Sequence, residues 1–137
     1  MPPLVFALLA SFFWGMTPIF EKLALVHASP LVALTLRSLI ATACLAVLTL
    51  LSGGFRELGD LPMRTFVWIT VASLTVTTGV LLYFYALKAD LASRVVPISG
   101  SYLLFTSLIA LLVLHEQITA ARLLGTVLIV FGVLLVR

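Results

Sequence analysis

The sequence predicts an all-α integral membrane protein, a bundle of five transmembrane helices. Three observations lead to this fold class: 63% of the 137 residues are apolar, only 9% are charged, and the apolar residues form long continuous runs. A soluble domain carries about 25% charged residues. A short domain also buries only about 60–70% of the surface of its unfolded chain. The composition therefore excludes a soluble globular protein, a disordered chain and a disulfide scaffold.

Five apolar runs define the expected helices. They cover residues 4–26, 30–51, 65–87, 91–114 and 118–136. Each run is close to the roughly 20 apolar residues that a helix needs to cross the hydrocarbon core of a bilayer. The runs are continuous rather than alternating, which favours helices over barrel strands. Most connections are short, so we expect antiparallel neighbours in a single domain over residues 1–137, with one polar loop at residues 53–62.

The charges of the chain do not orient it in the membrane. The formal net charge of +3 is spread along the sequence, and no cluster of cations suggests a nucleic acid or an anionic lipid surface as a partner. The basic residues that flank the runs are balanced between the two sides, so the positive-inside rule gives no orientation. Such balance is typical of a dual-topology protein and is equally compatible with one fixed orientation. The single cysteine, Cys44, is expected to be buried and inert.

Arg37 is the most informative residue because it lies inside the second run, near its middle. An arginine at the centre of a membrane helix costs roughly 2.5–3.5 kcal/mol on insertion scales. One interpretation is a side chain that extends to the nearer interface. The other is an anion-attracting or ion-paired group that faces a wet cavity. We favour the second, because Ser38 and Thr42 lie near Arg37 on the helix.

The first run carries its polar residues on one side. At 100° per residue, an arc of roughly 120° contains Ser11, Trp14, Pro18, Glu21 and Lys22. This arc is expected to line a groove inside the bundle or a partner surface. Glu21 and Lys22 lie within the end of the span, so each needs a counter-ion or water. The alternative is that both charges mark the interface and that Trp14 only fills space.

Two prolines lie inside expected helices. Pro18 and Pro97 each remove one backbone hydrogen bond and release a carbonyl group four residues earlier. Broken helices often supply backbone polarity near the substrate of a transporter, although structural kinks are also common. Pro97 is the stronger candidate for this role, because Arg94 and Ser101 share its face of the helix.

Hydroxyl groups form a stripe on the third run. Thr70, Ser73 and Thr77 share one face, and Tyr83 and Tyr85 follow them. These groups are interpreted either as part of a polar lining or as hydrogen bonds across helices, at about 0.6 kcal/mol each.

The fifth run has small residues on one side, namely Ala121, Gly125 and Gly132. Small residues let two membrane helices approach closely. This seam is interpreted as a packing surface, within one chain or between two.

The sequence shows no clear catalytic or metal-binding motif. The two histidines and the cysteine lie far apart and offer no spacing for metal ligands. Nor does the sequence contain a phosphate-binding loop, a GxSxG or an HExxH motif. We therefore expect a protein that is not an enzyme and has no cofactor, and ATP-driven pumping would need another subunit.

Ordered residues along the chain resemble an EamA domain. The first two helices of that domain are matched by Trp14-Gly15, Lys22, Pro30 and Arg37. Its last two helices are similar to Pro97 and the segment 111–136, where Glu116 stands for the acidic residue of the family's turn. The resemblance covers essentially the whole chain.

The resemblance implies a half-size member of the drug/metabolite transporter superfamily, most of whose members carry two five-helix repeats. Five helices place the two termini on opposite membrane faces, so an antiparallel homodimer would restore the inverted repeat common in secondary transporters. In the related small multidrug resistance proteins, a proton-coupled carboxylate lies about two turns before a lysine. Here Trp14 holds that position, which puts a cation/proton antiport mechanism in doubt. The Gly125–Gly132 pair is similar to the dimerising glycine seam of those proteins.

We therefore predict a secondary transporter, an exporter of a small metabolite or drug-like solute by alternating access, in the cytoplasmic membrane. Arg37 and Lys22 are expected to attract or pair charge, and Glu21 and Arg94 to take part in charge pairs. Trp14 and Tyr83 are expected to form aromatic walls around the solute. Pro97 and Ser101 are expected to provide polar groups near it. Two alternatives are a non-transporting accessory subunit and a component of a lipid-linked sugar flippase.

Overall fold

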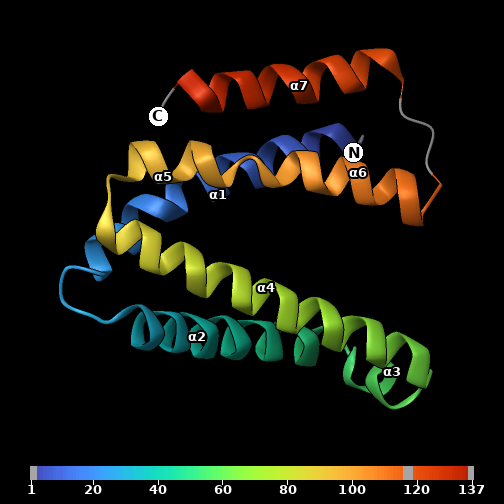
Figure 1. Ribbon diagram of the computed structural model, residues 1–137. Helices are drawn as coiled ribbons and strands as arrows, with labels where there is room; N and C mark the ends of the chain where they lie inside the picture. The colour runs from blue at the N-terminus through green and yellow to red at the C-terminus, as the bar shows by residue number, and fades with distance from the viewer. Residues whose placement is uncertain (1–2, 116–118, 136–137) are drawn as a thin grey trace. The chain divides into compact units, whose positions relative to one another are not determined.

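The computed structural model describes residues 3–115 and 119–135, which form helices joined by turns (Figure 1). The helices are α1 (Pro3–Ala24), α2 (Pro30–Leu51), α3 (Phe55–Gly59), α4 (Met63–Ala89), α5 (Ala92–Ser99), α6 (Tyr102–Val113) and α7 (Ala120–Leu135). Within these described ranges there is no strand. The predicted all-α fold class is confirmed.

The chain divides into two compact units, Met1–Lys88 and Ala89–Arg137. The first unit contains α1 to α4, and the second contains α5 to α7. Each unit is described by itself below.

Four stretches are long and apolar enough to cross a membrane. They are α1, α2, α4 and the segment Ala92–Val113. The bounds of α2 match the predicted run, and α4 extends two residues beyond its predicted run at each end. The apolar part of α7, Leu123–Val133, is shorter than a full crossing. Residues 116–118 and 136–137 lie outside the described ranges, so the fifth crossing and the role of Glu116 stay predictions.

The predicted polar loop contains a short helix, α3, that the sequence analysis missed. The chain leaves α2 through Gly53, whose φ of 72° lies in the left-handed region that favours glycine. The backbone N–H of Gly54 then donates to the Thr49 carbonyl at 2.9 Å, which closes the helix end. Five residues show no helical periodicity, so no pattern in the sequence could reveal α3.

The predicted run 91–114 corresponds to one candidate membrane span, Ala92–Val113, which is interrupted at Gly100 and Ser101, where α5 ends and α6 begins. Pro97 has no N–H, and the turn after it tightens, since the N–H of Ser101 donates to the Ile98 carbonyl at 3.1 Å. A Cβ at Gly100 would lie 3.0 Å from the Pro97 carbonyl oxygen. The break therefore depends on proline and glycine together.

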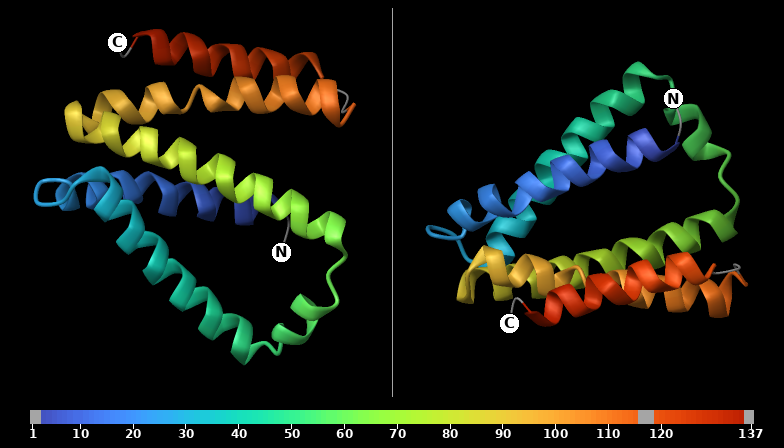
Figure 2. Two further views of the ribbon diagram at one scale, coloured as in Figure 1. Left: turned by 60° about the horizontal axis from the view of Figure 1, so that its bottom comes forward. Right: turned by 90° about the horizontal axis from the view of Figure 1, so that it is seen from above.

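In the first unit, α1, α2 and α4 converge at the turn over residues 25–29 and spread apart toward their other ends (Figure 2). The buried apolar side chains gather at the converging end and are Leu25, Leu34, Phe84 and Leu87. Pro30 is also buried and opens α2 as predicted, after the N-cap residue Ser29. Lipid is as apolar as leucine, so this packing gains little transfer energy. Polar contacts at this end therefore matter more than they would in water.

Two hydroxyl groups of the predicted stripe on α4 bond within their own helix. Thr70 donates to the Phe66 carbonyl and Ser73 to the Ile69 carbonyl, each at 2.8 Å. Neither bond crosses between helices, which corrects that interpretation for these two residues. A hydroxyl without a nearby partner bonds to the carbonyl four residues earlier, because an unsatisfied donor in lipid is costly. Cys44 is exposed rather than buried, since nothing in the first unit covers its side of α2.

In the second unit, α5 and α6 follow one line and α7 runs back alongside them (Figure 1). Val95 of α5 is buried. The small residues of α7 lie on an exposed side: Ala121, Gly125 and Gly132 are all exposed. Among the described residues, no atom beyond the neighbouring backbone of α7 lies within 4 Å of the place where a Cβ would stand at either glycine. Packing within the second unit therefore does not require glycine at these positions.

Candidate functional site

The strongest polar feature of the first unit is an ion pair between two helices. Nε of Arg37, on α2, lies 3.4 Å from Oε1 of Glu21, on α1. The Glu21 side chain is 10% exposed, whereas the Arg37 side chain is 48% exposed. A carboxylate with so little access to water needs a positive partner inside the membrane span. Arg37 provides it and still presents much of its own surface.

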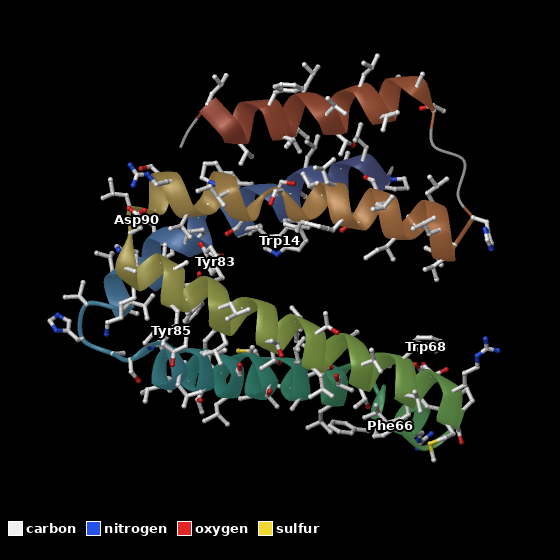
Figure 3. The ribbon with its side chains drawn as sticks, viewed as in Figure 1. Trp14, Phe66, Trp68, Tyr83, Tyr85 and Asp90 are labelled. Atoms are coloured by element: carbon white, nitrogen blue, oxygen red, sulfur yellow. The ribbon has the colours of Figure 1, made fainter. Side chains whose placement is uncertain are left out.

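Tyr83, on α4, adds a third polar group. Its hydroxyl oxygen is buried and has no hydrogen-bond partner among the described residues. Among the described residues, no hydrogen bond joins Tyr83 to Glu21 or Arg37. Tyr83 and Tyr85 project from opposite sides of α4 (Figure 3), as expected for residues two apart on a helix. A buried hydroxyl without a partner costs about 1–3 kcal/mol, so a water or ligand is expected to satisfy it.

The three groups lie at different distances from the ends of their helices. Glu21 is three residues before the end of α1, Arg37 seven residues after the start of α2, and Tyr83 six residues before the end of α4. At 1.5 Å per residue, the three Cα atoms lie roughly 5–10 Å inside the helix ends. Glu21 therefore lies near the end of its helix, whereas Arg37 lies closer to the middle of α2 than to its end, as the sequence predicted.

A cavity of about 290 Å³ opens beside the ion pair. It is lined by Thr17, Phe20, Glu21, Ala24, Ala33, Arg37 and Phe84, and we call it the Glu21–Arg37 groove. The Thr17 hydroxyl already donates to the Phe13 carbonyl at 2.9 Å. The groove thus combines one charged pair with mainly apolar walls, which is typical of ligand sites. Its volume is at the small end of their usual range of about 300–1,000 Å³.

Comparison with known proteins decides the family. The sequence model of the EamA-like transporter family matches residues 1–137. The chain belongs to the EamA-like transporter family. It is 26% identical over 129 residues to an uncharacterized transporter in the cobO 3′ region of a Sinorhizobium species, which covers 94% of this chain and 92% of that protein. It is also 26% identical over 133 residues to an uncharacterized protein of Methanocaldococcus jannaschii, over 96% and 93% of the two chains. No solved structure matches.

Family membership and the apolar helices together make this EamA-family chain a membrane protein of a transporter family. The lipid bilayer is its solvent, as the composition predicted. The resemblance that was identified from the sequence is confirmed.

Lys22 lies next to Glu21 but makes a different contact. Its Nζ donates to the Leu87 carbonyl near the end of α4. Lys88 makes a similar bond, from Nζ to the Ala28 carbonyl at 2.7 Å. Cations at helix C-termini satisfy carbonyl groups that have no partner within the helix. Lys22 does not line the Glu21–Arg37 groove, and its predicted role in binding solute stays a prediction.

Trp14 also lies away from the groove. It is 68% exposed in the isolated chain and is not among the residues that line the cavity. Pro18, one turn further along α1, is buried. The predicted arc of α1 is therefore covered near its C-terminal end and open at Trp14.

In the second unit, Arg94 pairs with a residue that the sequence analysis did not single out. Its Nη1 lies 3.1 Å from Oδ2 of Asp90, four residues earlier. Asp90 also accepts a hydrogen bond from the Leu91 N–H at 2.7 Å. The spacing of four between opposite charges could have revealed this pair. Pro97 and Ser101 lie partly buried at the break between α5 and α6.

Apolar wall residues of the groove, such as Phe20, Ala33 and Phe84, were also missed. No sequence signal distinguishes them, because most of the chain is equally apolar. Among the described residues, no three acidic, histidine or cysteine side chains lie close enough to hold a metal ion.

Proposed function

We propose that this EamA-family protein is a secondary transporter that exports a small solute by alternating access, with the Glu21–Arg37 groove as its solute site. The carrying observation is a charged pair at the wall of an apolar cavity, between helices long enough to span a membrane. The apolar walls suit an apolar or amphipathic body. The half-exposed Arg37 side chain suits a charged or polar group on the same solute.

Incomplete pairing supports binding over a purely structural role. Buried ion pairs rarely add stability compared with apolar packing. In the groove, Arg37 keeps half of its surface, and the Tyr83 hydroxyl has no partner among the described residues. A structural cluster would satisfy its own donors. This cluster leaves donors for a third molecule.

The other predicted contacts with the solute are proposed from where these residues lie in the fold. Pro97 and Ser101 lie at a break in a membrane-spanning stretch, where backbone polarity is available. Trp14 presents a large aromatic surface that the chain itself leaves uncovered. Lys22 holds the end of α4 and would change partner only if that helix moved.

We place the working unit as an antiparallel homodimer in the cytoplasmic membrane. Its support is the exposed small-residue side of α7, where a Cβ at Gly125 or Gly132 would meet no described atom within 4 Å beyond the neighbouring backbone of the helix. Mass measurement in detergent should give two chains per particle. Gly125→Leu with Gly132→Leu should give one chain, and an unchanged dimer would remove α7 from the interface.

Flux measurement tests the proposal. The purified protein is placed in lipid vesicles, and a panel of small organic acids, bases and neutral solutes is screened for movement. Arg37→Ala should abolish the flux that the wild type shows, with normal membrane insertion. Arg56→Ala, in the exposed α3, is the matched control and should keep it. Equal flux through both variants would remove the groove from transport. A wild type that is inert alone but co-purifies with one stoichiometric partner would favour the accessory-subunit alternative.

A further inference from the structure

In the groove, the positive charge of Arg37 is already paired with the carboxylate of Glu21. The closest approach of Glu21 to Arg37, 3.4 Å, is longer than the roughly 2.7–2.9 Å of a charge-assisted hydrogen bond. A loose pair of this kind can be replaced by a better-placed oxyanion. Glu21 therefore holds Arg37 in the solute-free state without filling all of its donors.

We propose that the groove binds a small monovalent oxyanion with an apolar body, which takes the place of the Glu21 carboxylate on Arg37 while Glu21 takes up one proton. The inference rests on the proposed function, because it names the class of solute and the coupling ion for the same groove.

Charge balance requires the proton. With Glu21 ionised and Arg37 protonated, the groove is neutral. Adding one anion would leave a net negative charge beside a carboxylate that is only 10% exposed. An uncompensated charge inside a membrane span is strongly unfavourable. One proton on Glu21 converts its carboxylate to a neutral carboxyl group, and the solute anion becomes the partner of Arg37. One proton then accompanies each monoanion, and the cargo as a whole is neutral.

Tyr83 completes the oxyanion site. Its buried hydroxyl has no acceptor among the described residues, and Tyr83 directly precedes Phe84, which lines the groove. An oxyanion bound by Arg37 would bring oxygens that can accept this hydrogen bond. Protonated Glu21 gains an O–H donor of its own. The same event thus satisfies donors that the solute-free chain leaves open.

The groups around Glu21 fit this exchange. Arg37 of α2 pairs with it, and on α4 the titratable Tyr83 directly precedes the lining residue Phe84. On its own helix, Lys22 is directed to the Leu87 carbonyl. The walls that remain are apolar, and Phe20 and Phe84 suit an aromatic or branched aliphatic body.

Proton counting on binding tests the proposal. Benzenesulfonate is the probe, because its oxygens take up no proton near neutral pH. Calorimetric titration of the full chain in detergent, in two buffers of different ionisation enthalpy, gives the protons bound per ligand. We expect about one proton for the wild type. We expect none for Glu21→Gln, which should bind at least as tightly because its amide carries no charge. The matched control is Glu57→Gln, in the exposed α3, which should still bind about one proton.

Two further variants keep the test decisive. Arg37→Lys retains the charge and should bind benzenesulfonate more weakly, still with one proton. Tyr83→Phe should weaken binding about tenfold, whereas a hydroxyl without a role would leave the affinity unchanged. Absence of binding by the wild type, no proton uptake, or proton uptake that persists in Glu21→Gln would each overturn the proposal.

This experiment separates the inference from the proposed function. Arg37-dependent flux of some other solute, without proton-linked binding of benzenesulfonate, would overturn the inference and leave transport standing. Proton-linked binding in a protein that moves no solute would support the inference for the site and contradict transport.

Discussion

Described residues form an ion pair in each unit of this EamA-family protein, and these two pairs differ in kind. Asp90 and Arg94 lie one turn apart at the start of one helix, 3.1 Å from each other and about half exposed. Glu21 and Arg37 are 3.4 Å apart, on two different helices, with the carboxylate nearly covered. The shorter pair is local and exposed, a class that contributes about 0.3–0.5 kcal/mol. The distance between the charged atoms therefore does not show which ion pair stabilises the protein more. Burial of the carboxylate, and whether the pair joins two separate helices, decide this.

The two ion pairs should differ most in the stability that is lost when the charge of their arginine is reversed. Arg37→Glu places two carboxylates at the groove and should destabilise the protein by about 3 kcal/mol, the low end for breaking a buried pair, since Arg37 is half exposed. Arg94→Glu should cost less than about 1 kcal/mol. Unfolding in mixed detergent micelles measures both.

The double variant Glu21→Arg with Arg37→Glu sharpens this contrast. It restores opposite charges and should recover most of the lost stability without recovering flux, because the positive group would then sit on the wrong helix. If Arg37→Glu and Arg94→Glu destabilised the protein equally, both ion pairs would act only locally.

A smaller effect is expected in double-mutant cycles. Neutralising Glu21 and Arg37 singly and together should give a coupling of about 1 kcal/mol, against about 0.3–0.5 kcal/mol for Asp90 and Arg94. Salt should weaken the second coupling more, since exposed charges are screened within about 10 Å at 0.1 M. A coupling at Glu21–Arg37 that vanishes in 0.5 M salt would place that pair in water.

The second unit should respond more to backbone geometry than to charge. Gly100→Ala places a Cβ 3.0 Å from the Pro97 carbonyl oxygen and should destabilise the protein by about 1 kcal/mol. Gly79→Ala, in α4, meets nothing within 4 Å and should be neutral or stabilising by up to about 1 kcal/mol. Comparing the unfolding of these two variants tests the account of the break, and a neutral Gly100→Ala would refute it.

The smallest effect is expected at the hydroxyl stripe of α4. Thr70→Ala and Ser73→Ala each remove a bond to the carbonyl four residues earlier in the same helix. Both should change stability by no more than about 0.5 kcal/mol, because no second helix loses a partner. A loss above about 1 kcal/mol in either would mean that the hydroxyl bonds another helix or chain.

The sequence predicts helix bounds well where chemical signals flank an apolar run. α2 begins at Pro30, directly after its N-cap residue Ser29, and its end precedes Gly53, so both bounds could be predicted. The break before α6 could be predicted only in part, because Pro97 is visible in the sequence whereas the close approach of Gly100 to the Pro97 carbonyl oxygen is not. Such a contact is three-dimensional and leaves no periodicity in the sequence.

Within the site, the charged residues could be found and their apolar neighbours could not. Glu21 and Arg37 stand out because charges are costly in lipid. Their approach also has a sequence signal, since they flank one short turn on two antiparallel helices. Phe20, Ala33 and Phe84 are apolar residues in an apolar chain, and only the packing of α1, α2 and α4 reveals them.

Occupancy of the Glu21–Arg37 groove is the most direct test of the central claim. With Cys44 replaced by serine, a single cysteine is introduced at Ala33, inside the groove, or at Thr35, two residues further along α2 and outside it. The rate of reaction with a small maleimide is measured with and without the solute that the flux screen identifies. The account predicts that the solute slows labelling at position 33 and leaves position 35 unchanged. Equal rates at position 33 with and without solute would contradict it.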